Sequence, residues 1–289
     1  MENRYIAERA RYLRLASLSV SEGLRFGGFR SAFRGQGMEF DSVREYQRGD
    51  DIRSIDRNVT ARTGTPHVKL YREERELTVF LVVDLSLSMS CPEASGSKRQ
   101  TALDVAGLLA FACEHDASPL GSVVFDAKTG RVFRPRTGAD HVLSVLASLE
   151  NHQTTEGGSA LSAALSGACR ILRNKSLVVV ISDFRATDYD KPLGLLARRH
   201  DVIACRIVSP FDGLLPSAGV LPFRDSESNL IVELPTSSSS FRAEWTRSQE
   251  ERLSRWEQTC KRRGAFPLVL STSGDPLRSL CAFFSGVRR

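Results

Sequence analysis

The stretch that most constrains the fold is Leu77 to Ser90, which reads LTVFLVVDLSLSMS. Its first half is almost entirely apolar and rich in β-branched and aromatic residues, which is typical of a strand buried on both faces of a parallel sheet. The stretch then changes abruptly to Asp84, Ser86 and Ser88. Because the chain that leaves a central strand of an α/β sheet enters the ligand-binding crevice, these side chains are candidate ligands. Hard oxygen donors of this kind suit Mg²⁺ or Mn²⁺.

A second acidic strand end supports this interpretation. Leu177 to Ile181 is another fully apolar strand, and Ser182 and Asp183 follow it. Two buried parallel strands that each end in an aspartate are expected to bring the carboxylates to one crevice. The alternative is a crevice without a metal, in which Asp84 and Asp183 only cap helices, because Asp and Ser are also the common residues of turns and N-caps.

From Leu77 onward, apolar strands alternate with amphipathic helices, which predicts an α/β fold with a doubly wound, mostly parallel sheet and helices on both faces. A tight turn at Lys128 to Gly130 predicts a hairpin at the sheet edge, and a second hairpin is expected near the C-terminal helices. The expected strands are 77–83, 121–126, 131–134, 177–181, 201–208, 220–224, 229–234 and 266–270. The expected helices are 98–115, 140–149, 159–172, 191–199, 241–263 and one that opens at Asp275 and Pro276.

The first 76 residues are predicted to form a separate N-terminal part, with residues 77–289 as the main domain. Residues 2–20 have helical periodicity, and a run of glycines from Gly23 onward is expected to end that helix. Residues 37–76 are dense in charge but carry regularly placed large apolar residues, so we expect irregular or small-strand structure packed on the main domain rather than a disordered tail. The residues expected to be buried there are Phe40, Tyr46, Ile52 and Ile55, and those expected to form a polar network along the contact are Arg44, Asp50, Asp51, Arg53 and Asp56.

Composition excludes several classes of protein. The 41% hydrophobic and 26% charged residues are typical of a soluble protein, and no apolar run is long enough to span a membrane. The six cysteines form no C-x-x-C pair, which argues against a zinc or iron–sulfur site and fits a reducing cytoplasm. With no signal peptide visible, we expect a cytoplasmic protein. The net charge of +6 comes from clusters of mixed sign, so nucleic acid is not an expected partner.

Three segments together resemble a von Willebrand factor A domain: the D-L-S-L-S run at Asp84, the Gly157-Gly158-Ser159 turn, and the apolar strand that ends in Ser182-Asp183. A second set of motifs, G-x-E-F, R-E-Y-x-x-G-D-D-x-R-x-I-D and A-R-T-G between Gly37 and Gly64, resembles the bacterial family called domain of unknown function 58. That family joins this block to an A-type domain, and the resemblance spans most of residues 37–280. One departure is Arg57, where the family usually has tryptophan.

The resemblance implies a metal-ion-dependent adhesion site, with Asp84, Ser86 and Ser88 on the first loop and Asp183 as the second carboxylate. The threonine of the family falls on Ser159, although Thr154 or Thr155 could supply that hydroxyl if the loop folds differently. The family also implies a partner of MoxR-type AAA+ ATPases that acts in the assembly or activation of client proteins.

Two classes of function remain open. The first is a non-enzymatic, metal-dependent interaction module, in which a partner carboxylate completes the coordination of a weakly bound Mg²⁺ or Mn²⁺. The second is a metal-assisted hydrolase that uses the paired carboxylates. No histidine has a recognisable catalytic context, although His152 lies closest to the Thr154–Ser159 loop, and no P-loop occurs. Because the crevice is expected to be solvated, replacing Asp84 with alanine is predicted to leave the fold intact.

Overall fold

The computed structural model describes residues 2–26, 37–74, 77–90, 97–154, 157–224 and 231–286. The chain divides into two compact units. The α/β unit comprises Met1–Ala32 with Thr78–Arg289, and the small unit comprises Phe33–Leu77. The N-terminal helix therefore groups with the α/β unit, whereas the sequence grouped it with the charged block. The packing of the block on the main domain stays a prediction.

A six-stranded sheet forms the centre of the α/β unit, in the order β10-β7-β6-β3-β4-β5. All neighbouring pairs are parallel except β4 and β5, which form the predicted antiparallel edge hairpin. The strands are β3 (Val79–Asp84), β4 (Leu120–Phe125), β5 (Thr129–Arg136), β6 (Leu177–Ser182), β7 (Asp201–Val208) and β10 (Phe266–Ser271). Every residue of β3 is buried, which confirms the central strand and the mostly parallel α/β fold.

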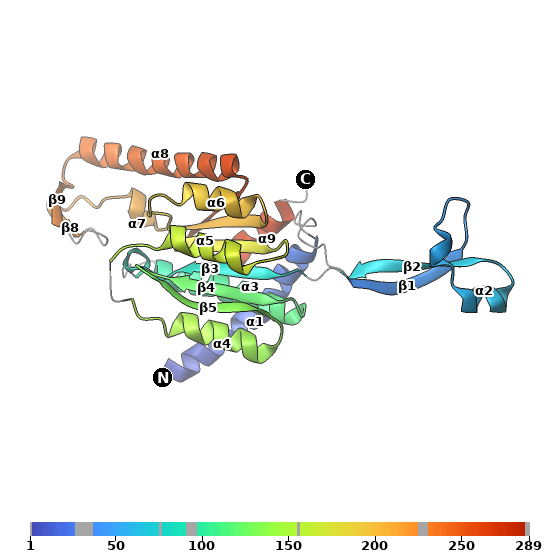
Figure 1. Ribbon diagram of the computed structural model, residues 1–289. Helices are drawn as coiled ribbons and strands as arrows, with labels where there is room; N and C mark the ends of the chain where they lie inside the picture. Colours follow the sequence, from blue (N-terminus) through green and yellow to red (C-terminus); the bar gives the residue numbers. More distant parts are fainter. Residues whose placement is uncertain are drawn as a thin grey trace. The chain divides into compact units, whose positions relative to one another are not determined.

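Helices cover both faces of this sheet (Figure 1). One layer consists of α5 (Leu161–Ile171), α6 (Asp190–Ala197) and α8 (Ser239–Arg263), and the other of α1 (Glu2–Phe26), α3 (Lys98–His115), α4 (Ala139–Glu150) and α9 (Pro276–Gly286). Successive residues of a strand point to opposite faces, so Phe80 and Val82 pack in the core under α5, α6 and α8. The short α7 (Pro210–Gly213) leads to the separate hairpin of β8 (Val220–Arg224) and β9 (Ile231–Pro235).

Helix α1 continues through Gly23 to Phe26, so the prediction that Gly23 ends the helix was wrong. A Cβ atom built at Gly23 would lie 2.9 Å from the Cβ atom of Phe284 in α9. The missing side chain therefore permits a close crossing of α1 and α9, and at this position tertiary packing outweighs the weak helix propensity of glycine. Residues 27–36, where the other glycines of this run lie, fall outside the described residues.

The small unit is an antiparallel hairpin of β1 (Gly37–Glu45) and β2 (His67–Glu74). The connection between the strands holds the 3-10 helix η2 (Ile52–Ser54) and the helix α2 (Arg57–Thr63), the second of which the sequence analysis did not identify. Asp51 caps η2 by accepting a hydrogen bond from the backbone N–H of Arg53. Asp56 caps α2 through the N–H groups of Asn58 and Val59.

Burial within the small unit differs from the prediction. Ile52 is 72% exposed, whereas Ile55 is half-buried and forms a β-bridge with the buried Val68. None of the three residues of η2 is buried, and Ile55, which follows the end of η2, is the residue that pairs with β2. Tyr46 is half-buried, and the side chain of Phe40 lies outside the described residues. The predicted polar residues bond within the unit, most clearly in the two 2.7 Å contacts of the Arg44 guanidinium with Asp50.

Three cysteines of the α/β unit, Cys113, Cys205 and Cys260, lie in its core. Cys113 and Cys205 are buried, and burial raises the pKa of both thiols. Cys169 is only half-buried, and Cys91 lies outside the described residues. Burial also raises the pKa of the Cys260 thiol, so all three buried cysteines are protonated packing residues rather than nucleophiles or metal ligands.

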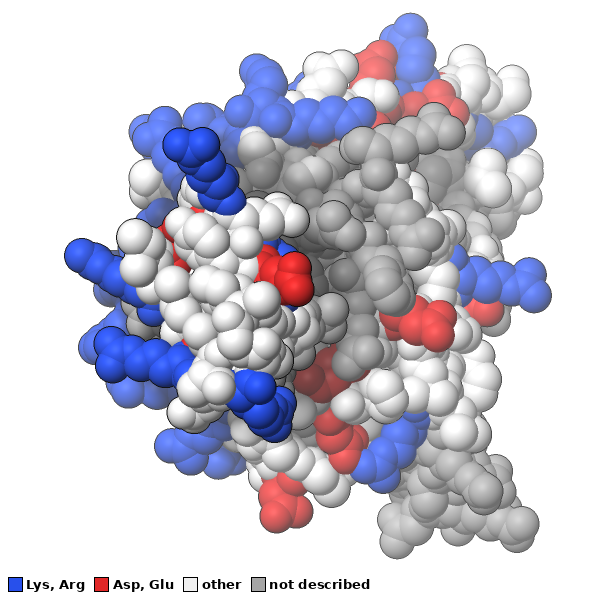
Figure 2. Space-filling view, turned by 90° about the vertical axis from the view of Figure 1, so that its right-hand side faces the viewer, with Lys and Arg blue, Asp and Glu red and all other residues white. Residues whose placement is uncertain are grey.

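Charged side chains of both signs occur on the face shown in Figure 2. Lys and Arg side chains project at many separate places, with Asp and Glu side chains between several of them. This distribution agrees with the clusters of mixed sign that account for the net charge of +6. Among the described residues, no helix is both long and apolar enough to cross a lipid bilayer.

Candidate metal centre

The two predicted carboxylates lie at the same edge of the sheet. Asp84 is the last residue of β3, and Asp183 follows the last residue of β6. The two strands are parallel neighbours, with Val83 opposite Ile181, so both aspartates leave the sheet side by side. Both are buried, at 2% and 3% exposure, which contradicts the prediction of a solvated crevice. Lys98 in the first turn of α3 lies 4.0 Å from Asp183, and such a contact between distant parts of the chain could not be predicted from the strand ends alone.

The Asp84 carboxylate is held by two hydrogen bonds. Its Oδ1 accepts from the backbone N–H of Ser86 at 3.0 Å, and its Oδ2 accepts from the hydroxyl of Ser182 at 2.6 Å. The same Ser182 oxygen accepts from the N–H of Phe184 at 2.9 Å. Phe184 has a φ of 53°, a left-handed conformation that is rare for a bulky residue and that turns the chain sharply just after Asp183. Ser182 therefore positions Asp84, a role that its place in the sequence did not reveal.

Electrostatics at Asp84 favour a nearby positive charge. Burial, together with the charge of Asp183, raises the pKa of Asp84 to about 6, although the hydrogen bonds from Ser182 and Ser86 oppose this rise. Two carboxylates that repel each other in a poorly solvated site are stabilised when a cation is shared between them. The charge of the pair therefore suits a hard divalent cation.

The first loop places its two hydroxyls together. Ser86 and Ser88 are 2% and 6% exposed, and their Oγ atoms lie 3.1 Å apart. The loop forms the 3-10 helix η3 (Leu87–Met89), and the N–H of Leu85 donates to the carbonyl of Phe125 at the end of β4. The structure thus brings Asp84, Ser86 and Ser88 together, next to the carboxyl end of β4.

The third loop reaches the same edge through backbone contacts. The N–H of Ala160 donates to the carbonyl of Asp126 at 2.7 Å, and the hydroxyl of Thr154 donates to the carbonyl of Leu85. Ser159 has a buried Oγ atom that makes no hydrogen bond within the described part of the chain. Because the Thr154 hydroxyl is held at Leu85 while the Ser159 oxygen is buried with none of its hydrogen-bonding capacity used, Ser159 fits the third-loop hydroxyl better. Thr155 lies outside the described residues.

A basic cluster that the sequence analysis missed adjoins Asp183. Lys98 is 3% exposed, and its Nζ lies 2.8 Å from Oδ2 of Asp212 and 4.0 Å from Oδ2 of Asp183. Arg185 contacts the same two aspartates, with its Nε 3.5 Å from Asp183 and its Nη2 2.8 Å from Asp212. Asp212 follows β7, so the strand-end rule that selected Asp84 and Asp183 could also have selected it. Nothing in the sequence marks Lys98 as buried.

The donor set matches a hard cation in kind. Asp183 Oδ2 and Ser159 Oγ are buried atoms that make no hydrogen bond within the described residues, so both have unused lone pairs. Carboxylate and hydroxyl oxygens suit Mg²⁺ or Mn²⁺, which keep water molecules where few carboxylates are supplied. The described residues include no group of three or more His, Cys, Asp or Glu side chains that could hold a metal, so a centre here would depend on hydroxyls.

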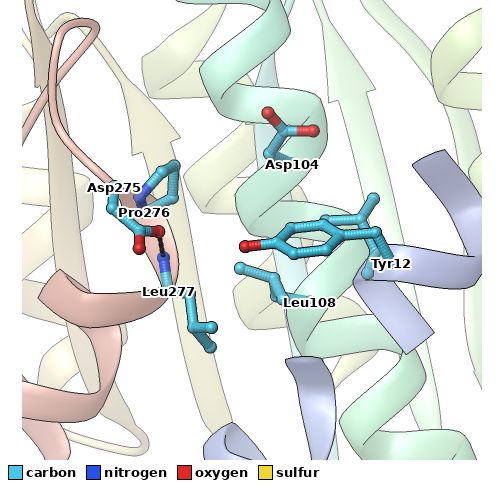
Figure 3. Close-up of a pocket in the computed structure, with 7 residues that line it drawn as sticks. Tyr12, Asp104, Leu108, Asp275, Pro276 and Leu277 are labelled. Atoms are coloured by element: carbon cyan, nitrogen blue, oxygen red, sulfur yellow. Dashed lines mark hydrogen bonds between the residues drawn. The ribbon is translucent and has the colours of Figure 1, made fainter. Parts of the chain in front are cut away.

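A cavity of about 200 Å³ lies elsewhere in the α/β unit, between α1, α3 and the start of α9. Tyr12 and Leu108 lie on one side of it, and Asp275, Pro276 and Leu277 on the other (Figure 3). The Asp275 carboxylate caps α9 by accepting the N–H of Leu277 at 2.9 Å. None of the predicted ligands lines this cavity, so it is separate from the candidate metal centre.

Comparison with known proteins now adds to the geometry. A family described as "Protein of unknown function DUF58" matches residues 42–255, which is most of the chain. The chain belongs to this family. The uncharacterised protein Rv1480 of Mycobacterium tuberculosis is 30% identical to this DUF58 protein over 98% of the chain and 90% of its own length.

Solved structures resemble the DUF58 chain in fold. The crystal structure of the conserved hypothetical protein BatB from Bacteroides thetaiotaomicron aligns with 73% of this chain and 98% of its own, at 15% identity and a TM-score of 0.50. The solved VWA domain of SpRpn10 aligns with 71% of this chain and 93% of its own, at 12% identity and a TM-score of 0.40. The α/β unit therefore shares its fold, a mostly parallel sheet covered by helices on both faces, with BatB, and at 15% identity the likeness concerns the fold alone.

Proposed function

We propose that this DUF58 protein is a non-enzymatic interaction module whose candidate metal centre binds Mg²⁺ or Mn²⁺ weakly. The residues that would hold the ion are Asp84, Ser86, Ser88, Ser159 and Asp183. We further propose that it works with a MoxR-type AAA+ ATPase on client proteins, a partnership that rests on the family resemblance of the sequence.

One observation carries the metal-binding part of the proposal. Oxygen donors from three loops lie at the carboxyl ends of the neighbouring strands β3, β4 and β6. Two of them are buried and make no hydrogen bond within the described residues: Ser159 Oγ, and Asp183 Oδ2, which the cations of Arg185 and Lys98 approach only to 3.5 and 4.0 Å. Buried polar atoms normally have partners, so such atoms point to a missing ligand. A divalent cation would bind these two oxygens and offer an open coordination position for a carboxylate of a partner protein.

The first test removes each carboxylate charge while its shape is kept. We expect Asp84→Asn and Asp183→Asn to weaken Mn²⁺ binding by roughly tenfold or more, since losses of this size follow even from changes outside the ligand shell. Titration calorimetry with Mn²⁺ measures the effect. Asparagine is preferable to alanine because Asp84 is buried and accepts two hydrogen bonds, so truncation would leave Ser182 and the Ser86 N–H unpaired.

Asp201→Asn is the matched control, because Asp201 begins β7 at the opposite edge of the same sheet and pairs there with Lys175 at 3.1 Å. Its affinity for Mn²⁺ should equal that of the wild type. Equal binding in all variants would remove the metal centre from the proposal. Capture of a MoxR-type ATPase by the tagged wild type, but not by Asp84→Asn, is the expected result for the partner.

A metal-assisted hydrolase is the second candidate, and one contact favours it. His152 Nε2 lies 3.2 Å from Asp126 Oδ2, beside the third loop, in the arrangement of a base oriented by a carboxylate. The same contact also explains how the end of α4 is held to the end of β4, so a positioning role suffices. Hydrolysis of phosphoesters or peptides that requires both His152 and Asp183 would favour the enzyme over the interaction module.

A further inference from the structure

The most unusual charged side chain in the α/β unit is Lys98. It is the first residue of α3, which Ser97 caps, and it is only 3% exposed. Lysine is almost never buried to this degree unless it is paired, because removing an ammonium group from water is costly. Here Nζ is paired with both carboxylate oxygens of Asp212, at 2.8 and 2.9 Å, and it also lies 4.0 Å from Oδ2 of Asp183.

The charges around Asp183 balance without any added ion. Asp84, Asp183 and Asp212 provide three carboxylates, and Lys98, Arg185 and Arg206 provide three cations. Arg206 interacts electrostatically with both Asp183 and Asp212. Adding a divalent cation to this group would leave it with an excess of two positive charges. A cation bound at Asp183 would therefore repel the ammonium group of Lys98, and Lys98 would in turn weaken the binding of the cation.

We propose that Lys98 is a built-in competitor of the divalent cation. Together with Arg185, its ammonium group neutralises Asp183 when no ion is bound, and it moves away from Asp183 while keeping its ion pair with Asp212 when an ion binds. The inference rests on the proposed metal centre and adds the residue that sets its affinity.

The geometry makes lysine suitable for this role. Its contact with Asp212 is more than 1 Å shorter than its contact with Asp183, so it can move away from Asp183 and keep its stronger ion pair. A flexible four-carbon stem permits such a shift, whereas the planar fork of arginine would not. Asp212 is itself fixed, because its Oδ2 accepts the N–H of Ser209 at 3.0 Å.

The test uses two substitutions with opposite expected effects on Mn²⁺ affinity in the full chain. Lys98→Met removes the competing charge and should tighten Mn²⁺ binding by roughly tenfold or more, on the scale of one charge at short range in a partly buried site. Asp212→Asn removes the charged partner of Lys98 other than Asp183. Lys98 should then pair more closely with Asp183, and the affinity for Mn²⁺ should fall. Lys175→Met, at the opposite edge of the sheet, should bind as the wild type does.

Thermal unfolding provides a readout that does not depend on a partner. Without metal, Lys98→Met removes one of the three cations beside Asp183 and Asp212, the one that is 3% exposed, so the unfolding midpoint of the variant should fall below that of the wild type. Mn²⁺ should then raise the midpoint of the variant more than it raises that of the wild type. The double variant Lys98→Met with Asp212→Asn removes one charge of each sign. It should fold more stably than the single variant and still bind Mn²⁺ more tightly than the wild type.

The outcomes separate the two proposals. If the wild type binds Mn²⁺ and neither Lys98→Met nor the double variant binds it more tightly, the role of Lys98 is overturned and the metal centre stands. If none of these folded proteins binds Mn²⁺, the metal centre of the proposed function fails, and the role of Lys98 fails with it.

Discussion

Buried ionisable side chains determine much of the behaviour of this DUF58 protein at the scale of single residues. Asp84 and Asp183 are buried beside Lys98, and each charge is tolerated because an opposite charge or a hydrogen-bond donor lies close by. Removing one partner from such a group costs more than the pair contributes, because the remaining charge is left in a poorly solvated place. Substitutions at these positions should therefore preserve the size and shape of the side chain, as the asparagine and methionine variants do.

His200 gives a prediction of the pH dependence of stability. This side chain is 2% exposed, and burial, with a smaller contribution from the charge of Arg199, lowers its pKa below the ordinary value of 6.5. The unfolded chain therefore binds a proton more readily than the folded one. The stability that neutral His200 contributes is present in full above pH 6.5 and is lost as the pH falls through the folded-state pKa.

Urea unfolding at about pH 7.5 and at about pH 5.5 measures this effect, because the two conditions lie on either side of the ordinary histidine pKa of about 6.5. We expect the wild type to lose more stability between them than His200→Gln, in which nothing titrates at this position. An identical loss in both proteins would show that His200 does not contribute to acid sensitivity.

At the scale of elements, the crossing of α1 with α9 explains how the N-terminal helix joins the α/β unit. Gly23 faces Phe284, and Gly107 of α3 faces Leu13 of α1, with an added Cβ atom at either glycine only 2.9 Å from the facing side chain. At Gly23 the facing atom is the Cβ atom of Phe284, which cannot move without the helix, so the crossing of α1 with α9 relies on this glycine, whereas the facing atom at Gly107 is the mobile Cδ1 of Leu13.

A pair of glycine-to-alanine substitutions tests this explanation. Gly23→Ala should destabilise the protein by about 1–3 kcal/mol, because the added methyl group overpacks against Phe284. Gly167→Ala in α5 is the control, since an added Cβ atom there would have no neighbour within 4 Å, and it should be neutral or stabilising by up to about 1 kcal/mol. Chemical denaturation compares the two, and equal effects would contradict close packing at Gly23.

At the scale of the whole molecule, the chain consists of two compact units joined at residues 32–33 and 77–78. The small unit has its own ladder of strand pairs from Gly37–Glu74 to Glu45–His67, and its aspartates cap its own helices. Among its described side chains, Val68 is buried at 2% exposure, whereas those of the other apolar residues in β1, η2 and α2 are at most half-buried. A unit this small buries little apolar surface by itself, so the contact with the α/β unit that the sequence predicts would stabilise it.

Hydrogen exchange of the isolated full chain tests that contact. If the block packs on the α/β unit as the sequence predicts, the β1–β2 amides should be protected nearly as well as those of β3. Exchange of these amides at the rates of an unfolded chain would instead identify the block as a docking arm that orders on a partner.

Elements that depend on neighbouring residues could be predicted from the sequence alone. The periodicity of apolar residues predicted α3 and β7 with the bounds that the structure has, and the polar ends of two apolar strands predicted that Asp84 and Asp183 meet. Tertiary packing determined the features that depend on residues far apart in the chain. Lys98 and its partner Asp212 are separated by 114 positions, and no local pattern records that they are buried together. The continuation of α1 through Gly23 likewise required Phe284 to be in place, because a glycine ends or continues a helix according to what lies against it.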